Sequence, residues 1–179
     1  MLKIKKRTLT EYVIYVAVIA VGIILDQLTK WLSVKYLQPI YPDSIPIIKN
    51  VFQLTYVEND GAAFGMLDNH RMLFMVPSVI MIVVLSLYLF LGLAENKLYA
   101  VSVAMIISGG IGNMIDRIAL GYVVDMLDFV LINFAVFNVA DSFVCVGAGL
   151  LIFALVLDLI KEFKAKKAEE EKGNANTED

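Results

Sequence analysis

The chain has very little of the chemistry on which many enzymes depend. Among its 179 residues there is one cysteine, Cys145, and one histidine, His70. A single cysteine excludes an internal disulfide, and this pair of residues is too small for a Cys/His or a histidine-only zinc site. No basic stripe with interleaved aromatic residues is present, so we expect no nucleic-acid partner. Any catalysis must therefore use other groups, of which Asp, Lys, Ser and Asn are the abundant candidates.

Apolar residues, in contrast, are plentiful, at 59% of the chain, whereas soluble domains have about 45–50%. Four segments approach the ~20 apolar residues that a helix needs to cross a bilayer. They are residues 12–31, 72–93, 98–115 and 137–160. No small-x-small cleavage site follows the first segment, so we interpret it as a retained span and not as a removed signal peptide.

The distribution of Lys and Arg predicts an orientation for these spans. The flank at 3–7 holds four such residues, the stretch 161–172 holds five, and the short turn between the second and third spans holds Lys97. Residues 33–71 hold three and residues 118–136 hold none. Because Lys and Arg favour the cytoplasmic side, we expect a multi-pass protein with both termini and the short turn in the cytoplasm. The two longer connections then face outward.

The outer connections contain strand-like sequence. Residues 51–57 are rich in β-branched and aromatic side chains, which suit a strand, and residues 122–134 have a similar character. We therefore predict an all-α membrane protein, a bundle of four transmembrane helices with a small extracytoplasmic β element. Residues 1–163 are expected to form one membrane-embedded domain, and the charged cytoplasmic tail 164–179 is expected to be disordered.

Polar residues gather where the predicted spans meet the outer face of the membrane. Charge inside a span costs ~2.5–3.5 kcal/mol at mid-bilayer on insertion scales, yet three spans carry it at this one level. The residues are Asp26 and Lys30 on the first span, Asn113, Asp116 and Arg117 on the third, and Asn138 and Asp141 at the start of the fourth. We expect these side chains to share a water-accessible hollow.

Each of these residues also has a purely structural interpretation. Asp26 and Lys30 are four positions apart and can form an ion pair within one helix. Asp116 and Arg117 can act as a structural or orienting pair. Asp141 stands in the first turn of a helix, where Asp is favoured as a cap. Taken singly, each residue therefore fits a structural role at least as well as a chemical one.

Five short motifs, in this order relative to the four spans, closely resemble those of lipoprotein signal peptidases, also called type II signal peptidases. The motifs are Asp26-Gln-Leu-Thr-Lys30, Asn59-Asp-Gly-Ala-Ala-Phe-Gly65, Gly109-Gly-Ile-Gly-Asn-Met-Ile-Asp-Arg117, Val123-Val-Asp125 and Phe137-Asn-Val-Ala-Asp141. Each motif alone is weak, but five in register are specific. The resemblance covers roughly residues 12–160.

The resemblance implies an aspartic endopeptidase, without metal or other cofactor, that cleaves a prolipoprotein before its diacylglyceryl-modified cysteine. It implies a bacterial cytoplasmic membrane location, an active site near the outer face, and contact with membrane lipid; we expect a monomer. The catalytic aspartates of the family fall on Asp125 and Asp141, although the nearby Asp128 leaves the first choice slightly open. Met126 follows Asp125 where Phe is common, which affects packing. The supporting residues of the family fall on Asp26, Lys30, Asn59, Asn113, Arg117 and Asn138.

Three other functions are compatible with parts of the pattern. Ser142 and Lys30 could form a serine–lysine protease, but Asp26 would favour the charged form of the lysine, and a base must be neutral. Intramembrane carboxylates also mark transporters and proton relays, although here the charges gather at one face. A structural membrane subunit would not need so many polar residues in its spans.

Overall fold

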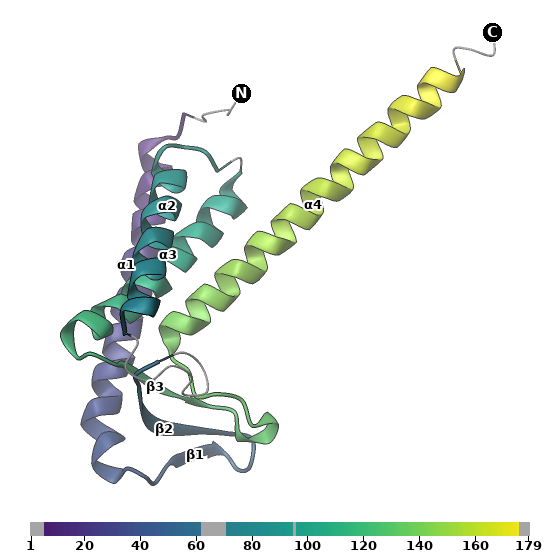
Figure 1. The fold of residues 1–179 in the computed structure, drawn as a ribbon. Helices are drawn as coiled ribbons and strands as arrows, with labels where there is room; N and C mark the ends of the chain where they lie inside the picture. Colours follow the sequence, from purple (N-terminus) through teal and green to yellow (C-terminus); the bar gives the residue numbers. More distant parts are fainter. Residues whose placement is uncertain (1–5, 62–70, 95, 176–179) are drawn as a thin grey trace.

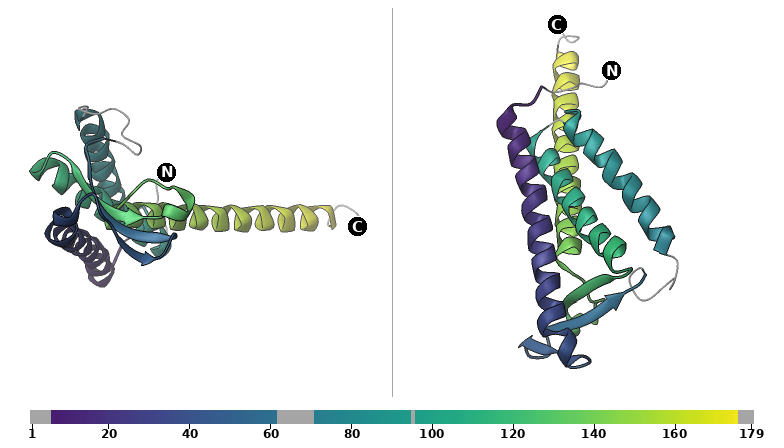
Figure 2. Two further views of the ribbon diagram at one scale, coloured as in Figure 1. Left: turned by 90° about the horizontal axis from the view of Figure 1, so that it is seen from below. Right: turned by 90° about the vertical axis from the view of Figure 1, so that its left-hand side faces the viewer.

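A computed structural model describes residues 6–61, 71–94 and 96–175 of the chain. Its helices form a bundle, and a small sheet lies at one end of that bundle (Figure 1). The start of α1 and the end of α4 both lie at the opposite end (Figures 1 and 2). In chain order the elements are α1 (Leu9–Tyr36), η1 (Gln38–Ile40), β1 (Ile45–Ile48), β2 (Phe52–Asn59), α2 (Arg71–Phe90), α3 (Lys97–Ala119), β3 (Val123–Asp128), η3 (Val130–Ile132) and α4 (Val139–Ala175).

The helices agree with the predicted membrane protein. Three helical segments in the described part of the chain are long and apolar enough to cross a membrane, namely Leu9–Ile40, Lys97–Ala119 and Val139–Lys167. These confirm the first, third and fourth predicted spans. The second predicted span falls on α2, a 20-residue helix whose described apolar stretch, Met75–Phe90, is shorter.

The start of α1 is fixed by a capping box and an arginine. Thr8 accepts a hydrogen bond from the backbone N–H of Glu11, and the Glu11 side chain accepts one from the N–H of Thr8, so two otherwise free donors are satisfied. Arg7 donates to the Tyr15 hydroxyl and to the carbonyl of Ala94. These contacts join α1 to the connection between α2 and α3.

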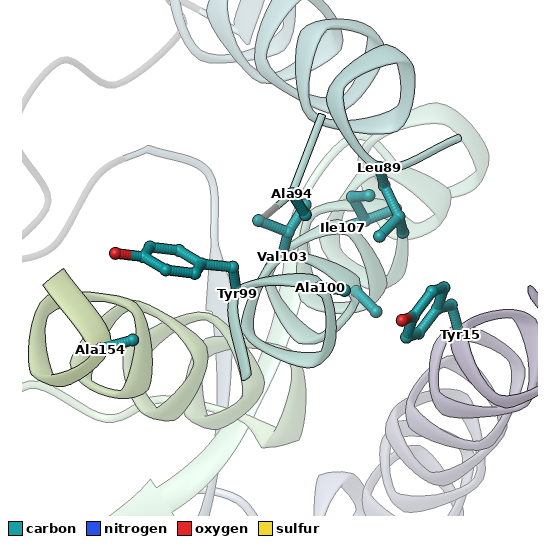
Figure 3. Close-up of a cluster of buried hydrophobic side chains, with 9 residues drawn as sticks. Tyr15, Leu89, Ala94, Tyr99, Ala100, Val103, Ile107 and Ala154 are labelled. Atoms are coloured by element: carbon teal, nitrogen blue, oxygen red, sulfur yellow. The ribbon is translucent and has the colours of Figure 1, made fainter. Parts of the chain in front are cut away.

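The third helix is central, because α3 packs against α1, α2 and α4. Its inner residues, together with Tyr15 of α1, Leu89 of α2 and Ala154 of α4, form the main hydrophobic core (Figure 3). Small residues allow close approach between α3 and α4: a Cβ atom at Gly109 would overlap the carbonyl oxygen of Ala140. Such close packing is typical of helices in lipid.

The last helix is longer than the sequence predicts. The sequence predicts disorder from residue 164, but α4 continues as a helix to Ala175 and extends away from the bundle (Figure 1). The physical reason is composition: residues 161–172 are mostly Lys, Glu and Ala, which are strong helix formers. A charged segment can therefore continue an existing helix without burying apolar surface.

The sheet is antiparallel with the order β1-β2-β3, and it confirms the small β element predicted from the outer connections. In the pairing of β2 with β3, Val57 lies opposite Asp125 and Asn59 lies opposite Val123. The Phe137 carbonyl accepts from the N–H of Leu127 at 2.8 Å, and the N–H of Phe137 donates back to Leu127 at 3.0 Å. The sheet thus holds the start of α4 against β3.

Candidate active site

A buried ion cluster joins α1 to α3 at the sheet end of the bundle. Lys30, only 3% exposed, places its Nζ atom 2.9 Å from Asp26 Oδ2 and 3.0 Å from Asp116 Oδ2. The same ammonium donates to Asn113 Oδ1 at 2.9 Å. Because a buried charge is tolerated only when it is paired and hydrogen-bonded, this lysine and its two carboxylates form one structural unit.

Two residues that the sequence analysis missed complete this cluster. Gln27 donates from Nε2 to Asp116 Oδ1 at 3.0 Å, to Asp26 Oδ2 at 3.2 Å and to the Gly112 carbonyl at 3.2 Å. A Cβ atom at Gly112 would lie 2.6 Å from Asp26 Oδ2, so any side chain here would have to displace this carboxylate. Both residues lie inside the quoted motifs, but nothing in their residue types indicates that they lie beside the Asp26 carboxylate.

The two carboxylates of the cluster also bind backbone outside α1. Asp26 Oδ1 accepts from the N–H of Ala140 at 2.9 Å, which satisfies a free donor in the first turn of α4. Asp116 Oδ2 accepts from the N–H of Val124 at 3.1 Å, at the start of β3. The ion cluster therefore fixes the two elements that carry Asp125 and Asp141.

Asp125 is held by two asparagine side chains. Its Oδ1 accepts from Asn138 Nδ2 at 2.6 Å and its Oδ2 accepts from Asn59 Nδ2 at 2.8 Å, and the residue is 1% exposed. Burial raises the pKa of Asp125 from 3.8 to about 6. The charge of Asp141 contributes to this rise, and the two asparagine bonds oppose it. Such a carboxyl can carry a proton much nearer to neutral pH than an exposed one.

Asp141 stands in the first turn of α4 and faces the same region. Its Oδ1 accepts from Asn113 Nδ2 at 2.7 Å. Its Oδ2 accepts from the N–H of Asn138 at 3.2 Å, and Asn138 Oδ1 accepts from the N–H of Asp141 at 2.9 Å. This reciprocal pair is a capping box. The helix-cap interpretation of Asp141 is therefore correct, and it fixes the carboxylate beside the other polar groups.

Asp125 and Asp141 both line one cavity of about 490 Å³, next to the sheet. Arg117 also lines it, and Arg117 Nη1 donates to the Asn113 carbonyl at 3.5 Å. The remainder of the wall is mostly apolar. The other lining residues are Asn59, Gly61, Phe134, Ala135, Val136, Phe137, Ser142 and Cys145. Two carboxylates and a guanidinium in a mostly apolar hollow are suited to acid–base chemistry on an amphipathic substrate.

The predicted site residues therefore converge, but they do so in two layers. Six lie at or around the cavity and two, Asp26 and Lys30, lie in the ion cluster behind it. The predicted pairing of Asp116 with Arg117 is not the main one, since Asp116 forms its ion pair with Lys30. The cavity layer is Asp125, Asp141, Asn59, Asn113, Arg117 and Asn138.

The structure separates Asp128 from this site. Asp128 Oδ2 accepts from Gln53 Nε2 at 2.7 Å and from Thr55 Oγ1 at 3.2 Å, at the far end of β3. Ser142 Oγ donates to the Asn138 carbonyl at 3.0 Å, whereas the Lys30 ammonium forms its ion pairs with Asp26 and Asp116. Among the described residues, the geometry thus favours Asp125 over Asp128 and gives no support to a Ser142–Lys30 pair.

Parts of the predicted pattern fall outside the described residues, namely 62–65 of the second motif and His70. Among the side chains that the structure describes, no group of three from His, Cys, Asp or Glu is placed to hold a metal ion.

Fold and site together define a helical membrane protein with a two-carboxylate cavity at one end of its bundle. The family model of signal peptidase (SPase) II matches residues 18–157, and the chain therefore belongs to this family of membrane peptidases. The lipoprotein signal peptidase of Caldanaerobacter subterraneus subsp. tengcongensis is 52% identical over 141 residues, 79% of this chain and 94% of that protein. The lipoprotein signal peptidase of Halalkalibacterium halodurans is 40% identical over 157 residues, 87% of this chain and 99% of that protein.

A solved structure described as a bacterial membrane enzyme, determined by the in meso method, has the same fold. It aligns with a TM-score of 0.74 at 27% sequence identity, and the alignment covers 88% of this chain and 94% of that one. The arrangement of helices and sheet is therefore shared with a membrane enzyme over nearly the whole length of both chains.

Proposed function

We propose that this protein is an aspartic lipoprotein signal peptidase, which cleaves a prolipoprotein before its diacylglyceryl-modified cysteine. The observation that carries the proposal is that Asp125 and Asp141 line the same cavity and that asparagine donors hold both carboxylates. Family membership and the names of the relatives support the substrate class.

Two carboxyl groups in one site do not both ionise readily, so the pair retains a proton over a range of pH. The ionised member takes a proton from water, and the water oxygen attacks the carbonyl carbon of the scissile peptide. The protonated member donates to the carbonyl oxygen, and the nitrogen of the leaving peptide takes up a proton as the C–N bond breaks. The proton is shared, so neither Asp125 nor Asp141 has a fixed role.

The surrounding side chains have two tasks in this mechanism. Three side-chain amides donate hydrogen bonds to the two carboxylates and so orient the pair; they belong to Asn59, Asn113 and Asn138. Arg117 keeps its positive charge at all relevant pH values, and it lines the cavity where a peptide carbonyl would lie. The pair supplies both proton acceptor and donor, and hydrolysis needs no cofactor.

We further propose that the sheet end of the molecule faces outward. The start of α1 and the end of α4 share the opposite end (Figure 1), and the basic flanks of these helices favour the cytoplasm. The cavity then lies near the outer face, and substrate acyl chains remain in lipid between the helices. Reporter fusions at Asp43 and Asn96 should report outside and inside respectively; the reverse pattern would contradict this orientation.

Cleavage of a diacylated prolipoprotein peptide by purified protein tests the function. Asp125→Asn and Asp141→Asn should each reduce turnover about a thousandfold or more, since an amide cannot exchange a proton in this way. Asp128→Asn is the matched control, because it changes the same residue type on the same strand and should keep most activity. Activity should persist in a strong chelator.

Three outcomes would contradict the proposal. If Asp128→Asn is inactive while Asp125→Asn turns over normally, the wrong carboxylate is assigned. If Ser142→Ala alone removes activity, the mechanism is not aspartic. If a chelator stops cleavage and a divalent metal restores it, the reaction depends on metal.

A further inference from the structure

Two adjacent hollows lie where the end of α1 and η1 meets the sheet, and they share no lining residue with the carboxylate cavity. The first, of about 280 Å³, has an almost wholly apolar wall that includes Leu32, Leu37 and Leu54. The second, of about 350 Å³, is lined by Gln38, Tyr41, Tyr56, Val57 and Glu58. Leu37 lines the first hollow and the next residue, Gln38, lines the second, so the two hollows are neighbours.

The second hollow combines aromatic rings with a carboxylate. Glu58 Oε1 accepts from the Tyr56 hydroxyl at 2.9 Å and from Gln38 Nε2 at 3.4 Å, which fixes the carboxylate beside the hollow. Tyr41, 63% exposed, supplies a second ring. Aromatic faces together with a negative charge are the groups that recognise an ammonium ion.

A positive charge lies on the last turn of α1, close to the first hollow. Lys35 Nζ is 4.9 Å from the centre of the Trp31 ring and 5.1 Å from that of Tyr36, and Tyr36 lines the first hollow. These two cation–π contacts hold the ammonium at the helix surface, where it can meet an anionic group.

The aromatic residues of this region mark a membrane interface. Trp31, Tyr36 and Tyr41 are 55%, 56% and 63% exposed, and they follow the apolar part of α1. Exposed Trp and Tyr at the end of a span lie at the level of lipid headgroups. The first hollow thus lies at the level of a lipid chain, and Lys35 lies at the level of the phosphate. The second hollow lies at the level of the outer part of the headgroup.

We propose that these hollows bind a membrane phospholipid with an ammonium headgroup, of the phosphatidylethanolamine type. One acyl chain occupies the first, apolar hollow, the phosphate contacts Lys35, and the ammonium binds in the second hollow between the Tyr41 ring and the Glu58 carboxylate. The charge pattern selects this lipid, because Lys35 and Glu58 complement a zwitterion, whereas an anionic phospholipid without an ammonium leaves Glu58 unmatched.

Native mass spectrometry of delipidated protein in detergent tests the proposal, with phosphatidylethanolamine and phosphatidylglycerol of identical chains as probes. Wild-type protein should retain one phosphatidylethanolamine in preference to phosphatidylglycerol. Glu58→Gln should weaken phosphatidylethanolamine binding about tenfold and remove the preference. Tyr41→Ala, at an exposed position, should also weaken it. Asp43→Asn, an exposed acidic residue that lines neither hollow, is the matched control and should bind as wild type does.

Equal binding of both lipids by wild-type protein, or an unchanged preference in both Glu58→Gln and Tyr41→Ala, would overturn the proposal. Displacement of the phospholipid by an equimolar diacylglyceryl peptide would assign the hollow to substrate chains and would overturn it as well. Binding is measured without cleavage, so a failure of the proposed peptidase mechanism would not affect this result.

Discussion

Removal of the buried lysine is the sharpest test of how the site is supported. In Lys30→Met, Asp26 and Asp116 keep their positions but lose the cation that lies 2.9 and 3.0 Å from them. Methionine is similar in length, so the change removes charge more than volume. Breaking a buried ion pair by deleting one partner costs about 3–5 kcal/mol, and here one deletion leaves two carboxylates uncompensated.

The loss should be visible in thermal unfolding of the purified protein in detergent. For a chain of this size, 1 kcal/mol shifts the unfolding temperature by about 2–4 °C. Lys30→Met should therefore unfold at least about 6 °C lower than wild type. Lys161→Met is the matched control, because Lys161 is 73% exposed and pairs with Asp158 at 2.9 Å; solvent screens this pair, so its unfolding temperature should not change.

A triple variant separates charge from packing. Lys30→Met combined with Asp26→Asn and Asp116→Asn removes all three charges and should recover much of the lost stability. Wild-type stability of the single variant would refute the assignment of this cluster as a structural unit. A triple variant no more stable than Lys30→Met would show that the lysine acts through contacts other than neutralisation.

Two further predictions concern packing and pH. Gly112→Ala should destabilise the protein by about 1–3 kcal/mol, because the added Cβ would lie 2.6 Å from Asp26 Oδ2, whereas Gly149→Ala, with nothing within 4 Å, should not destabilise it; equal unfolding temperatures would contradict this. Since burial raises the pKa of Asp125 to about 6, its ionisation opposes folding. Stability should therefore fall as the pH rises from about 4 through about 6, by at most about 3 kcal/mol. Asp125→Asn should not show this fall in stability. Parallel pH profiles of the wild type and Asp125→Asn would refute the prediction.

The sequence alone predicts the helices well and their ends less well. Long apolar runs identify α1, α3 and α4, because burial in lipid requires them regardless of tertiary detail. The end of α4 differs from the prediction, since charge alone does not distinguish a disordered tail from a helix that continues on Lys, Glu and Ala. The pairing of β2 with β3 depends on contacts distant in the chain, such as Val57 with Asp125, and no local pattern gives that register.

The site residues could be named from the motifs, but their partners could not. Helical spacing predicts the contact of Asp26 with Lys30, which are on one helix. It does not predict that Lys30 also binds Asp116, or that Asp26 accepts from the backbone of Ala140. Those contacts depend on how two helices approach each other, and that approach is set by small residues such as Gly112, whose role is visible only in three dimensions.

The spacing of Asp26 and Lys30 has a consequence for how the chain enters the membrane. The first helix is synthesised before α3 and α4 exist, so neither Asp116 nor the N–H of Ala140 is yet available. Asp26 and Lys30 are one helical turn apart, and Lys30 Nζ lies 2.9 Å from Asp26 Oδ2. Each residue therefore provides the counter-ion of the other while α1 inserts into the membrane. An aspartate or a lysine alone would face the lipid uncompensated. The helix that later supports the carboxylate cavity can thus enter the bilayer before the partners that complete its ion cluster are made.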